Sequence, residues 1–349
     1  MKVLYSFNKE GQEAQTWMRE LAAASTARIE LIPFNHAPYL DPNRYIRAQL
    51  LDNLYFAEDA RLLRLYRDLT EQLRVHAPDV LLVDTCPPYH PEFLRTLSIY
   101  KVLRTSDGPL TAYDRDFAYV HAYDHILYHS PAYSRDLTMA DKLAYCGARR
   151  CDFWPMWLFD GAYDARRSEA DLHLHERPVD VVFVGAFHIG KMADLAAIKR
   201  HFGRRCTMHG LISPKKNAYF NLRHRFPGWI RPIRWDEYVP LYQRSKIGFN
   251  VHNRGKFTVG NYRLFELPAN GVMQVSDGGE YLGHFFEPGR EIVAAETAAA
   301  MIERIEYFLT HAEERRAIAM QGFRAVLQRH RFAHRVQQLA DILEAAVRR

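Results

Sequence analysis

The first part of the chain alternates short apolar runs with stretches in which apolar side chains recur at helical spacing. Val3 to Phe7 predicts a first strand, the residues up to Ala24 a helix, and Arg28 to Phe34 a second strand. Further elements follow the same alternation: helices between residues 45 and 75, and strands near 79–83, 99–103 and 125–129. This pattern is typical of a parallel sheet with helices on both faces.

A second alternation begins at Asp180, after a polar stretch with few large apolar side chains. Asp180 to Gly185 predicts a strand that is followed by a helix near Met192 to Phe202. Two more strands are expected at 206–209 and 247–251, and the apolar positions keep helical spacing from Glu296 to the end.

The chain has 349 residues, which is more than one hydrophobic core usually organises. We therefore predict an α/β protein with two Rossmann-like, doubly wound domains that face each other across a cleft, followed by C-terminal helices. The predicted parts are a first Rossmann-like domain at 1–160, a linker at 161–178, a second Rossmann-like domain at 179–329, and a C-terminal helix at 330–349 that packs back on the first domain.

Composition excludes several classes of protein. No apolar run approaches the roughly 18 residues of a membrane-spanning helix, and the N-terminus shows no export signal, so no integral membrane segment is expected. Four cysteines without a Cys-x-x-Cys pair favour a reducing cytoplasm over a disulfide framework or a zinc ribbon. A net charge of +6 and a pI near 9.0 favour anionic ligands.

The most informative segment runs from Asn261 to Gly271, where a loop leads into a helix that carries Arg263 and Glu266 three residues apart. An arginine beside a helix N-terminus can hold a phosphate, and a carboxylate can hold sugar hydroxyls. Upstream, Gly185 to Lys191 joins a strand to a helix, so its glycines allow the backbone to approach phosphate closely. This turn lacks the Ser or Thr of a kinase-type P-loop.

Together these motifs resemble GT-B glycosyltransferases. Arg-x-Phe-Glu-x-x-Ala-x-Gly from Arg263, followed by Phe-x-Pro-Gly-x-Glu at 286–291, is most similar to the CgeB-like (spore maturation protein-like) family, and the resemblance covers most of residues 178–335. It implies a GT-B-like fold and transfer of a sugar, hexosyltransferase-like and with retention favoured over inversion. The donor would be UDP-, GDP- or dTDP-linked and the acceptor is unknown, and neither a cofactor nor a metal is implied.

The resemblance also assigns the donor site. It places Glu266 on the ribose hydroxyls and the turn before Lys191 on the diphosphate. The full set of donor-binding candidates is Gly185, His188, Lys191, Asn250, His252, Asn261, Arg263 and Glu266. The family motif has a second glutamate eight residues before Glu266, and this chain has Thr258 there. The contact to the donor's sugar ring is therefore open.

On the acceptor side, polar residues follow the predicted strands of the first domain. Asp107 is the preferred candidate for the general base, because it follows a strand and resembles an acidic loop of the family, and His36 is a second candidate for catalysis. Asp114 to Asp116 has an Asp-x-Asp spacing that could hold a divalent ion, but it follows a proline-containing loop instead of a buried strand. His173 and His175 could also suggest metal, but they lie in the polar linker with no third ligand nearby.

Two alternatives to a cytoplasmic glycosyltransferase follow from the same residues. The basic and aromatic stretch from Lys215 to Arg225 could bind single-stranded nucleic acid, although a solvated face with Tyr219 and Phe220 packed inward is favoured. Thr258 would also permit a nucleotide-sugar-binding scaffold without activity. The first alternative predicts salt-sensitive binding of oligonucleotides, and the second predicts binding without hydrolysis or transfer.

Overall fold

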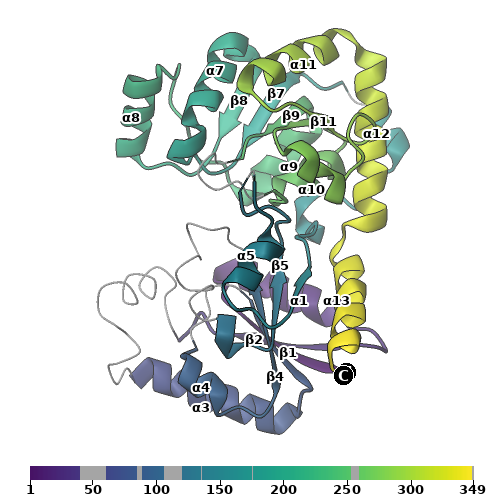
Figure 1. The fold of residues 1–349 in the computed structure, drawn as a ribbon. Coiled ribbons are helices and arrows are strands. Elements are labelled where there is room, and N and C mark those ends of the chain that lie inside the picture. The colour runs from purple at the N-terminus through teal and green to yellow at the C-terminus, as the bar shows by residue number, and fades with distance from the viewer. Residues whose placement is uncertain are drawn as a thin grey trace. The chain divides into compact units, whose positions relative to one another are not determined.

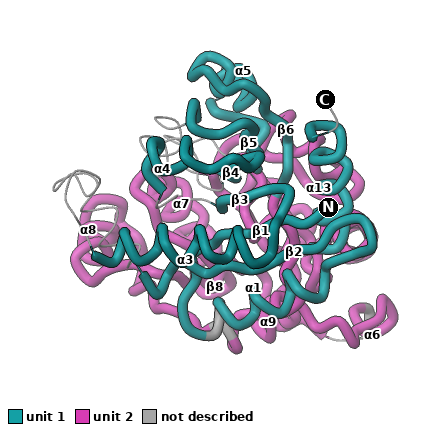
Figure 2. The backbone as a smooth tube through the Cα atoms, turned by 90° about the horizontal axis from the view of Figure 1, so that it is seen from below, with its two compact units in different colours: residues 1–155, 332–349 teal, residues 156–331 magenta. Residues whose placement is uncertain are grey.

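The computed structural model describes residues 1–39, 60–84, 89–105, 120–134, 136–174, 176–252 and 259–347. The chain divides into two compact units (Figure 2). Unit 1 comprises Met1–Pro155 and Phe332–Arg349, and unit 2 comprises Met156–Arg331. The predicted boundaries at residues 160 and 329 stay predictions.

Unit 1 is built on a six-stranded sheet in the order β2-β1-β3-β4-β5-β6, in which every pair is parallel (Figure 1). The central strands carry runs of fully buried apolar side chains, as sheets covered on both faces do. The strands are β1 (Lys2–Phe7), β2 (Glu30–Asn35), β3 (Val80–Asp84), β4 (Tyr100–Thr105), β5 (His125–Tyr128) and β6 (Cys151–Phe153).

Among the described residues of unit 1, helices cover both faces of this sheet. They are α1 (Gly11–Ala24), α3 (Ala60–His76), α4 (Pro91–Arg95), α5 (Met139–Tyr145) and α13 (Phe332–Val347), with the 3-10 helix η2 (Val120–Ala122). The C-terminal helix α13 contacts α1 and buries its apolar face. The Trp154 indole fixes it by donating to the Arg335 carbonyl over 2.8 Å.

Unit 2 contains a five-stranded parallel sheet in the order β11-β10-β9-β7-β8. Its strands are β7 (Val179–Val184), β8 (Cys206–His209), β9 (Ser245–Asn250), β10 (Met273–Ser276) and β11 (Val293–Ala294). Its helices are α6 (Glu169–Leu174), α7 (Met192–Phe202), α8 (Pro214–His224), α9 (Trp235–Gln243), α10 (Arg263–Ala269), α11 (Ala298–Thr310) and α12 (Ala312–Arg329). Short 3-10 helices are η3 (Asp160–Ala162), η4 (Ile189–Lys191), η5 (Gly203–Arg205) and η6 (Gly279–His284).

The strand order of unit 2 creates a topological switch point between β7 and β9. The chain leaves β7 toward β8 on one side, and it returns to pair β9 with the other side of β7. The loops after β7 and β9 therefore diverge, and open α/β sheets bind ligands in the resulting crevice at the carboxyl ends of the strands. Two donor-binding candidates lie at these strand ends: Gly185 follows β7, and Asn250 is the last residue of β9.

The predicted α/β class is confirmed in both units, and the expected strands of each sheet are present. The helix at Met192–Phe202 and the strand at Cys206–His209 have the predicted bounds. Three strands were not predicted: β6 has three residues, β10 has four and β11 has two, too few to show a period of two. The stretch 161–178, predicted as a linker, contains α6 and lies within unit 2.

Candidate functional site

Most of the predicted donor-binding residues gather at the switch point of unit 2. Gly185 follows β7, Asn250 ends β9, Lys191 ends η4 before α7, and Arg263 begins α10. Arg263 donates to Val184 and Asn250 and lies against Gly185, and its charge affects Lys191. A set of residues spread over about 80 positions of the sequence thus forms one basic site.

Arg263 is the buried centre of this site. Its Nε donates to the Val184 carbonyl over 2.6 Å, and its Nη1 donates to Asn250 Oδ1 over 2.9 Å. The guanidinium also lies 4.2 Å from the centre of the Phe183 ring, which gives a cation–π contact. Burial lowers the pKa of Arg263, and the Tyr242 hydroxyl opposes this change as a hydrogen-bond partner. Arg263 therefore holds the carboxyl ends of β7 and β9 together with one cationic group.

Gly185 gives Arg263 the space it needs. A Cβ atom at this position would lie 1.6 Å from Arg263 Nη2, a distance no side chain can occupy. On its other side, a Cβ at Gly210 would lie 1.8 Å from the Gly185 carbonyl oxygen. The turn after β7 is thus confined from two directions, and only glycine fits between the guanidinium and the next strand end.

Lys191 places a second positive charge beside the first. Its side chain is buried, and its ammonium lies 5.7 Å from the centre of the Phe183 ring. Burial lowers its pKa to about 7, Arg263 adds to this decrease through charge repulsion, and Asp277 opposes it. Within the described part of the chain, no hydrogen bond or ion pair reaches this ammonium. Two buried cations close together favour a bound anion.

An amide pair positions Arg263. The Asn250 and Asn261 side chains donate to each other reciprocally over 3.1 Å, and Asn261 Oδ1 also accepts from the Leu264 backbone N–H at the start of α10. Because Asn250 Oδ1 additionally accepts from Arg263, the pair joins the end of β9 to α10. Both asparagines were predicted as donor-binding residues. In the structure, their hydrogen bonds hold Arg263 and the start of α10 in place.

His252 is fixed by Asp277, which follows β10. Both carboxylate oxygens of Asp277 accept from the His252 backbone N–H over 3.0 Å, and Oδ1 lies 2.5 Å from His252 Nδ1. This contact makes Nδ1 the protonated ring nitrogen and directs Nε2 away from the carboxylate. Asp277 was not among the predicted residues, although it directly follows a buried strand, which is the signal that could have identified it.

Glu266 lies one turn beyond Arg263 on α10 and is partly exposed. Its burial raises the pKa of its carboxyl group to about 7, whereas Arg263 and a hydrogen bond with Tyr238 act in the opposite direction. The carboxyl group is therefore poised between the neutral and ionised forms near neutral pH. His188, the remaining donor-site candidate, is an exposed residue of the turn before η4.

The candidates of unit 1 have a different character. Asp107 lies outside the described residues. His36 is fully buried, its Nδ1 lies 3.0 Å from Ser6 Oγ, and Ser6 Oγ lies 2.6 Å from the Tyr89 hydroxyl. Burial lowers the pKa of His36 to about 3, so it is a neutral group at pH 7 and a weak base.

A second polar network in unit 1 was not predicted from the sequence. Arg104 Nη1 donates to Asp84 Oδ1 over 2.6 Å, and the Tyr5 hydroxyl donates to Asp84 Oδ2 over 3.0 Å. The Arg104 guanidinium also lies 5.1 Å from the centre of the Trp154 ring. These buried side chains connect β1, β3 and β4 near their carboxyl ends, where the acceptor-side candidates were expected.

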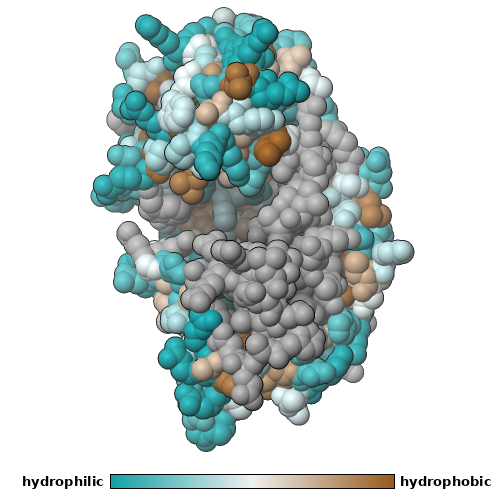
Figure 3. Space-filling model, turned by 90° about the vertical axis from the view of Figure 1, so that its left-hand side faces the viewer, coloured by the Kyte–Doolittle hydropathy of each residue, from teal (hydrophilic) through white to brown (hydrophobic). Residues whose placement is uncertain are grey.

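The remaining candidates receive little support. Asp114 to Asp116, Thr258 and His175 lie outside the described residues, and no cluster of three potential metal ligands occurs within the described ranges. The stretch from Lys215 to Arg225 forms α8, with Phe220 fully buried. Tyr219 is 44% exposed, so the prediction that it packs inward is wrong. The upper part of Figure 3 shows this end of unit 2 as a mostly hydrophilic face with separate hydrophobic residues.

No helix in the described ranges is both long and apolar enough to cross a membrane. The cytoplasmic location expected from the cysteines stays a prediction.

Comparison with known proteins identifies a domain. Residues 193–341 match the family model described as glycosyl transferase-like, and this match begins in α7 and ends in α13. No curated protein sequence matches the chain at a significant level. The matched segment includes Asn250, Arg263 and Glu266, and it begins two residues after Lys191.

Solved structures show the same fold over the whole chain. HepE from Anabaena in complex with UDP-glucose aligns with a TM-score of 0.63 at 11% identity, covering 99% of this chain and 100% of that one. Sucrose-phosphate synthase from Thermosynechococcus elongatus gives 0.64 at 11% identity with the same coverage, and a glycosyltransferase from Rickettsia africae gives 0.62 at 10% identity, covering 99% of this chain and 98% of that one. The predicted GT-B fold is therefore confirmed.

Proposed function

We propose that this chain, which carries a glycosyl transferase-like domain in a GT-B fold, transfers a sugar from a nucleotide diphosphate to an acceptor, and that unit 2 binds the donor. The observation that carries the proposal is the pair of buried cations at the switch point. Lys191 and Arg263 lie at the carboxyl edge of the sheet, where such folds bind ligands, and they favour an anion with more than one charge.

The roles of the residues follow from their geometry. Cleavage of the bond between sugar and diphosphate leaves negative charge on the departing phosphate oxygens. Lys191 can neutralise this charge directly, and Arg263 contributes its charge from behind Gly185. Glu266, partly exposed on α10, would accept hydrogen bonds from the ribose hydroxyls when it is ionised. The two cations would supply the charge stabilisation, so we further propose that the reaction needs no metal.

Three finer assignments belong to the same proposal. The chain is CgeB-like, as its motifs at 263–271 and 286–291 indicate. It retains the configuration of the transferred hexose, as the resemblance of residues 261–271 to the donor-binding motif of retaining GT-B enzymes implies. Unit 1 supplies the acceptor side, with Asp107 as the group that receives the acceptor proton, since buried His36 is too weak a base for this step.

Titration with UDP, GDP and dTDP tests the proposal. We expect one of the three to raise the melting temperature of the full chain, by an amount that corresponds to about 2.7 kcal/mol at a hundredfold excess over its Kd. Glu266→Gln should lower the nucleotide affinity about tenfold, because the neutral amide replaces one of the two acceptor oxygens by a donor and forms no charge-assisted hydrogen bonds with ribose. EDTA should leave the effect unchanged.

Glu303→Gln is the matched control, because Glu303 is exposed on α11 and should leave nucleotide binding as it is. If none of the three nucleotides shifts the melting temperature, the enzyme assignment fails. Slow hydrolysis of the corresponding nucleotide sugar without acceptor would separate an active enzyme from a binding scaffold.

Binding of that nucleotide sugar should also depend on pH in a bell-shaped manner. Ionisation of Glu266 and protonation of Lys191 are both needed, and both groups have a pKa of about 7. Affinity should therefore rise as pH increases to about 7 and fall above it. In Glu266→Gln only the falling side should remain, and in Lys191→Met only the rising side. Isothermal titration between about pH 6 and 8 measures both, and two unchanged profiles would contradict these roles.

A further inference from the structure

A second basic pocket lies at the opposite edge of the unit 2 sheet. Its volume is about 360 Å³, and its lining includes Pro178 directly before β7, Lys246 at the start of β9 and Gly271 before β10. Because the strands are parallel, these positions mark the amino edge of the sheet. Lys191 and Arg263 lie at the carboxyl edge, so the two sites are separated by the length of the strands.

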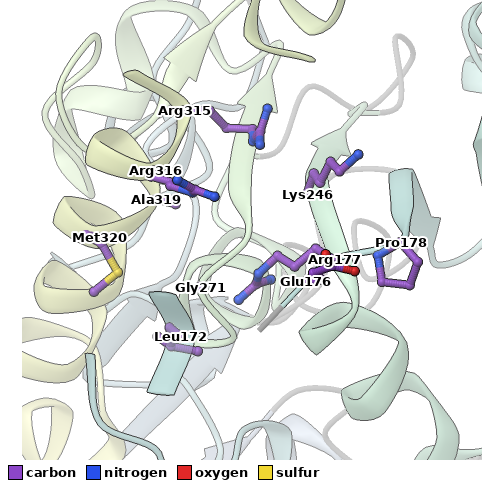
Figure 4. A pocket seen from close by; sticks show the side chains of 10 residues that line it. All are labelled: Leu172, Glu176, Arg177, Pro178, Lys246, Gly271, Arg315, Arg316, Ala319 and Met320. Carbon is purple, nitrogen blue, oxygen red and sulfur yellow. The ribbon is translucent and has the colours of Figure 1, made fainter. Parts of the chain in front are cut away.

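Four basic side chains line this pocket against one carboxylate, that of Glu176. They are Arg177, Lys246, Arg315 and Arg316. Figure 4 shows Arg315 and Arg316 reaching into the pocket from α12, while Arg177 enters from the segment before β7. Three guanidinium groups thus converge from two elements on one small volume.

Acidic side chains next to the pocket pair with two of these four cations and leave the other two unbalanced. Lys246 Nζ contacts Asp180 Oδ1 over 2.5 Å, and Arg316 Nη1 contacts Glu313 Oε1 over 2.8 Å. Asp180 is shared with a further cation, Arg205, at 2.7 Å.

The other two arginines, Arg177 and Arg315, form no ion pair with a carboxylate of the described residues. Arg177 donates to the carbonyls of Tyr242, Ser245 and Asn270, so its position is fixed by the backbone. Arg315 uses Nη1 on the Phe308 carbonyl over 2.6 Å and on that of Leu309 over 3.4 Å. Within the described ranges its Nε and Nη2 donate no hydrogen bond, although the side chain is largely buried.

Charge repulsion between these groups adds to the argument. Burial lowers the pKa of Arg315, and Arg316 lowers it further, against the opposite effects of Asp180 and Glu313. Burial also lowers the pKa of Arg177 to about 10, with added contributions from Arg167 and Arg315. A bound anion would relieve this repulsion, and guanidinium groups hold phosphate through paired, charge-assisted hydrogen bonds.

We propose that this pocket is a second anion site, which binds a small phosphate ester at the amino edge of the sheet. The apolar side chains of Leu172, Ala319 and Met320 line the wall formed by α6 and α12, and they would contact the organic part of the ligand. A pocket of this volume accepts a sugar phosphate. Since α12 also contacts α10, which carries Arg263, occupancy of the pocket bears on the helix that forms the first site.

Isothermal titration of the full chain with pyrophosphate and with glucose 6-phosphate tests this site. Arg316→Glu should weaken binding at the pocket about tenfold or more, and Arg316→Gln should weaken it less, because the first reverses the charge and the second only removes it. Arg316 is half-exposed, and among the described residues its ion-pair partner is exposed Glu313, so the fold should tolerate both changes. Arg304→Glu, on the exposed face of α11, is the matched control and should leave binding unchanged.

Lys191→Met distinguishes this site from the first one, because it should leave glucose 6-phosphate binding at the pocket intact. Tighter binding of glucose 6-phosphate than of pyrophosphate would identify an ester as the preferred source of phosphate, and the reverse order would reject the ester. If neither probe binds, or if binding is lost in Lys191→Met and unchanged in Arg316→Glu, the second site does not exist. Nucleotide binding at the first site is unaffected by that result.

Discussion

Gly185→Ala should weaken nucleotide diphosphate binding by about 100-fold or more, which is the loss that a displacement of about 1 Å at a binding group can cause. The added methyl group would lie 1.6 Å from Arg263 Nη2, so the guanidinium must leave its position. Arg263 would then lose its hydrogen bonds to Val184 and Asn250, and the ends of β7 and β9 would separate. We also expect a loss of stability of roughly 1–3 kcal/mol from overpacking.

Gly283→Ala provides the control for this change. Gly283 lies in η6 of the same unit, is exposed, and has no atom within 4 Å of an added Cβ. Its melting temperature and nucleotide affinity should match those of the unchanged protein. A Gly185→Ala protein that binds the nucleotide normally would show that Arg263 does not contribute to the donor site.

The succession of strands and helices along the chain could be predicted in large part, because local patterns indicate each element. Buried runs such as Val80 to Val83 are apolar throughout, and the helix after Lys191 shows its periodicity within eleven residues. By contrast, β10 has only four residues, and its assignment depends on pairing with β9. Asp277 was missed with it, because its contact to His252 joins residues 25 positions apart.

The burial of Lys191 could not be predicted either. At the start of a helix, a lysine normally extends into water, and nothing next to it in the sequence indicates otherwise. Its burial depends on Phe183 in the preceding strand and on Arg263, which comes from a segment more than 70 residues later in the chain. The resemblance pointed to this turn as a candidate, whereas the burial and the charge environment of Lys191 depend on the tertiary structure.

His36 illustrates the opposite case. The sequence places it in a loop after a strand, which is typical of a group that faces a ligand. In the structure it is buried against Ser6, in a network with Tyr89 that connects β1 to the segment after β3. A polar residue at a strand end can therefore be buried in the core of its own unit, and only the three-dimensional packing distinguishes this structural role from ligand binding.

Lys191→Met is expected to weaken binding of the nucleotide diphosphate and to stabilise the free protein. Loss of a buried charge that pairs with phosphate should cost about 2–5 kcal/mol of binding free energy. In the free protein, the same ammonium is buried beside Arg263, so an apolar side chain of similar length should raise the free energy of unfolding by about 1–4 kcal/mol. A purely structural lysine would show the opposite change in stability.

The pH dependence gives this prediction a second measurement. The pKa of Lys191 is lowered from 10.5 to about 7 in the folded state, so unfolding takes up a proton between these values and the free energy of unfolding rises with pH across that window. Lys191→Met should remove this rise, as chemical denaturation at several pH values would show. Lys199→Met on α7 is a comparison of the same kind, but its ammonium contacts two carbonyls, so its loss should destabilise the protein. If Lys191→Met is destabilised like Lys199→Met and binds the nucleotide normally, Lys191 does not form part of the donor site.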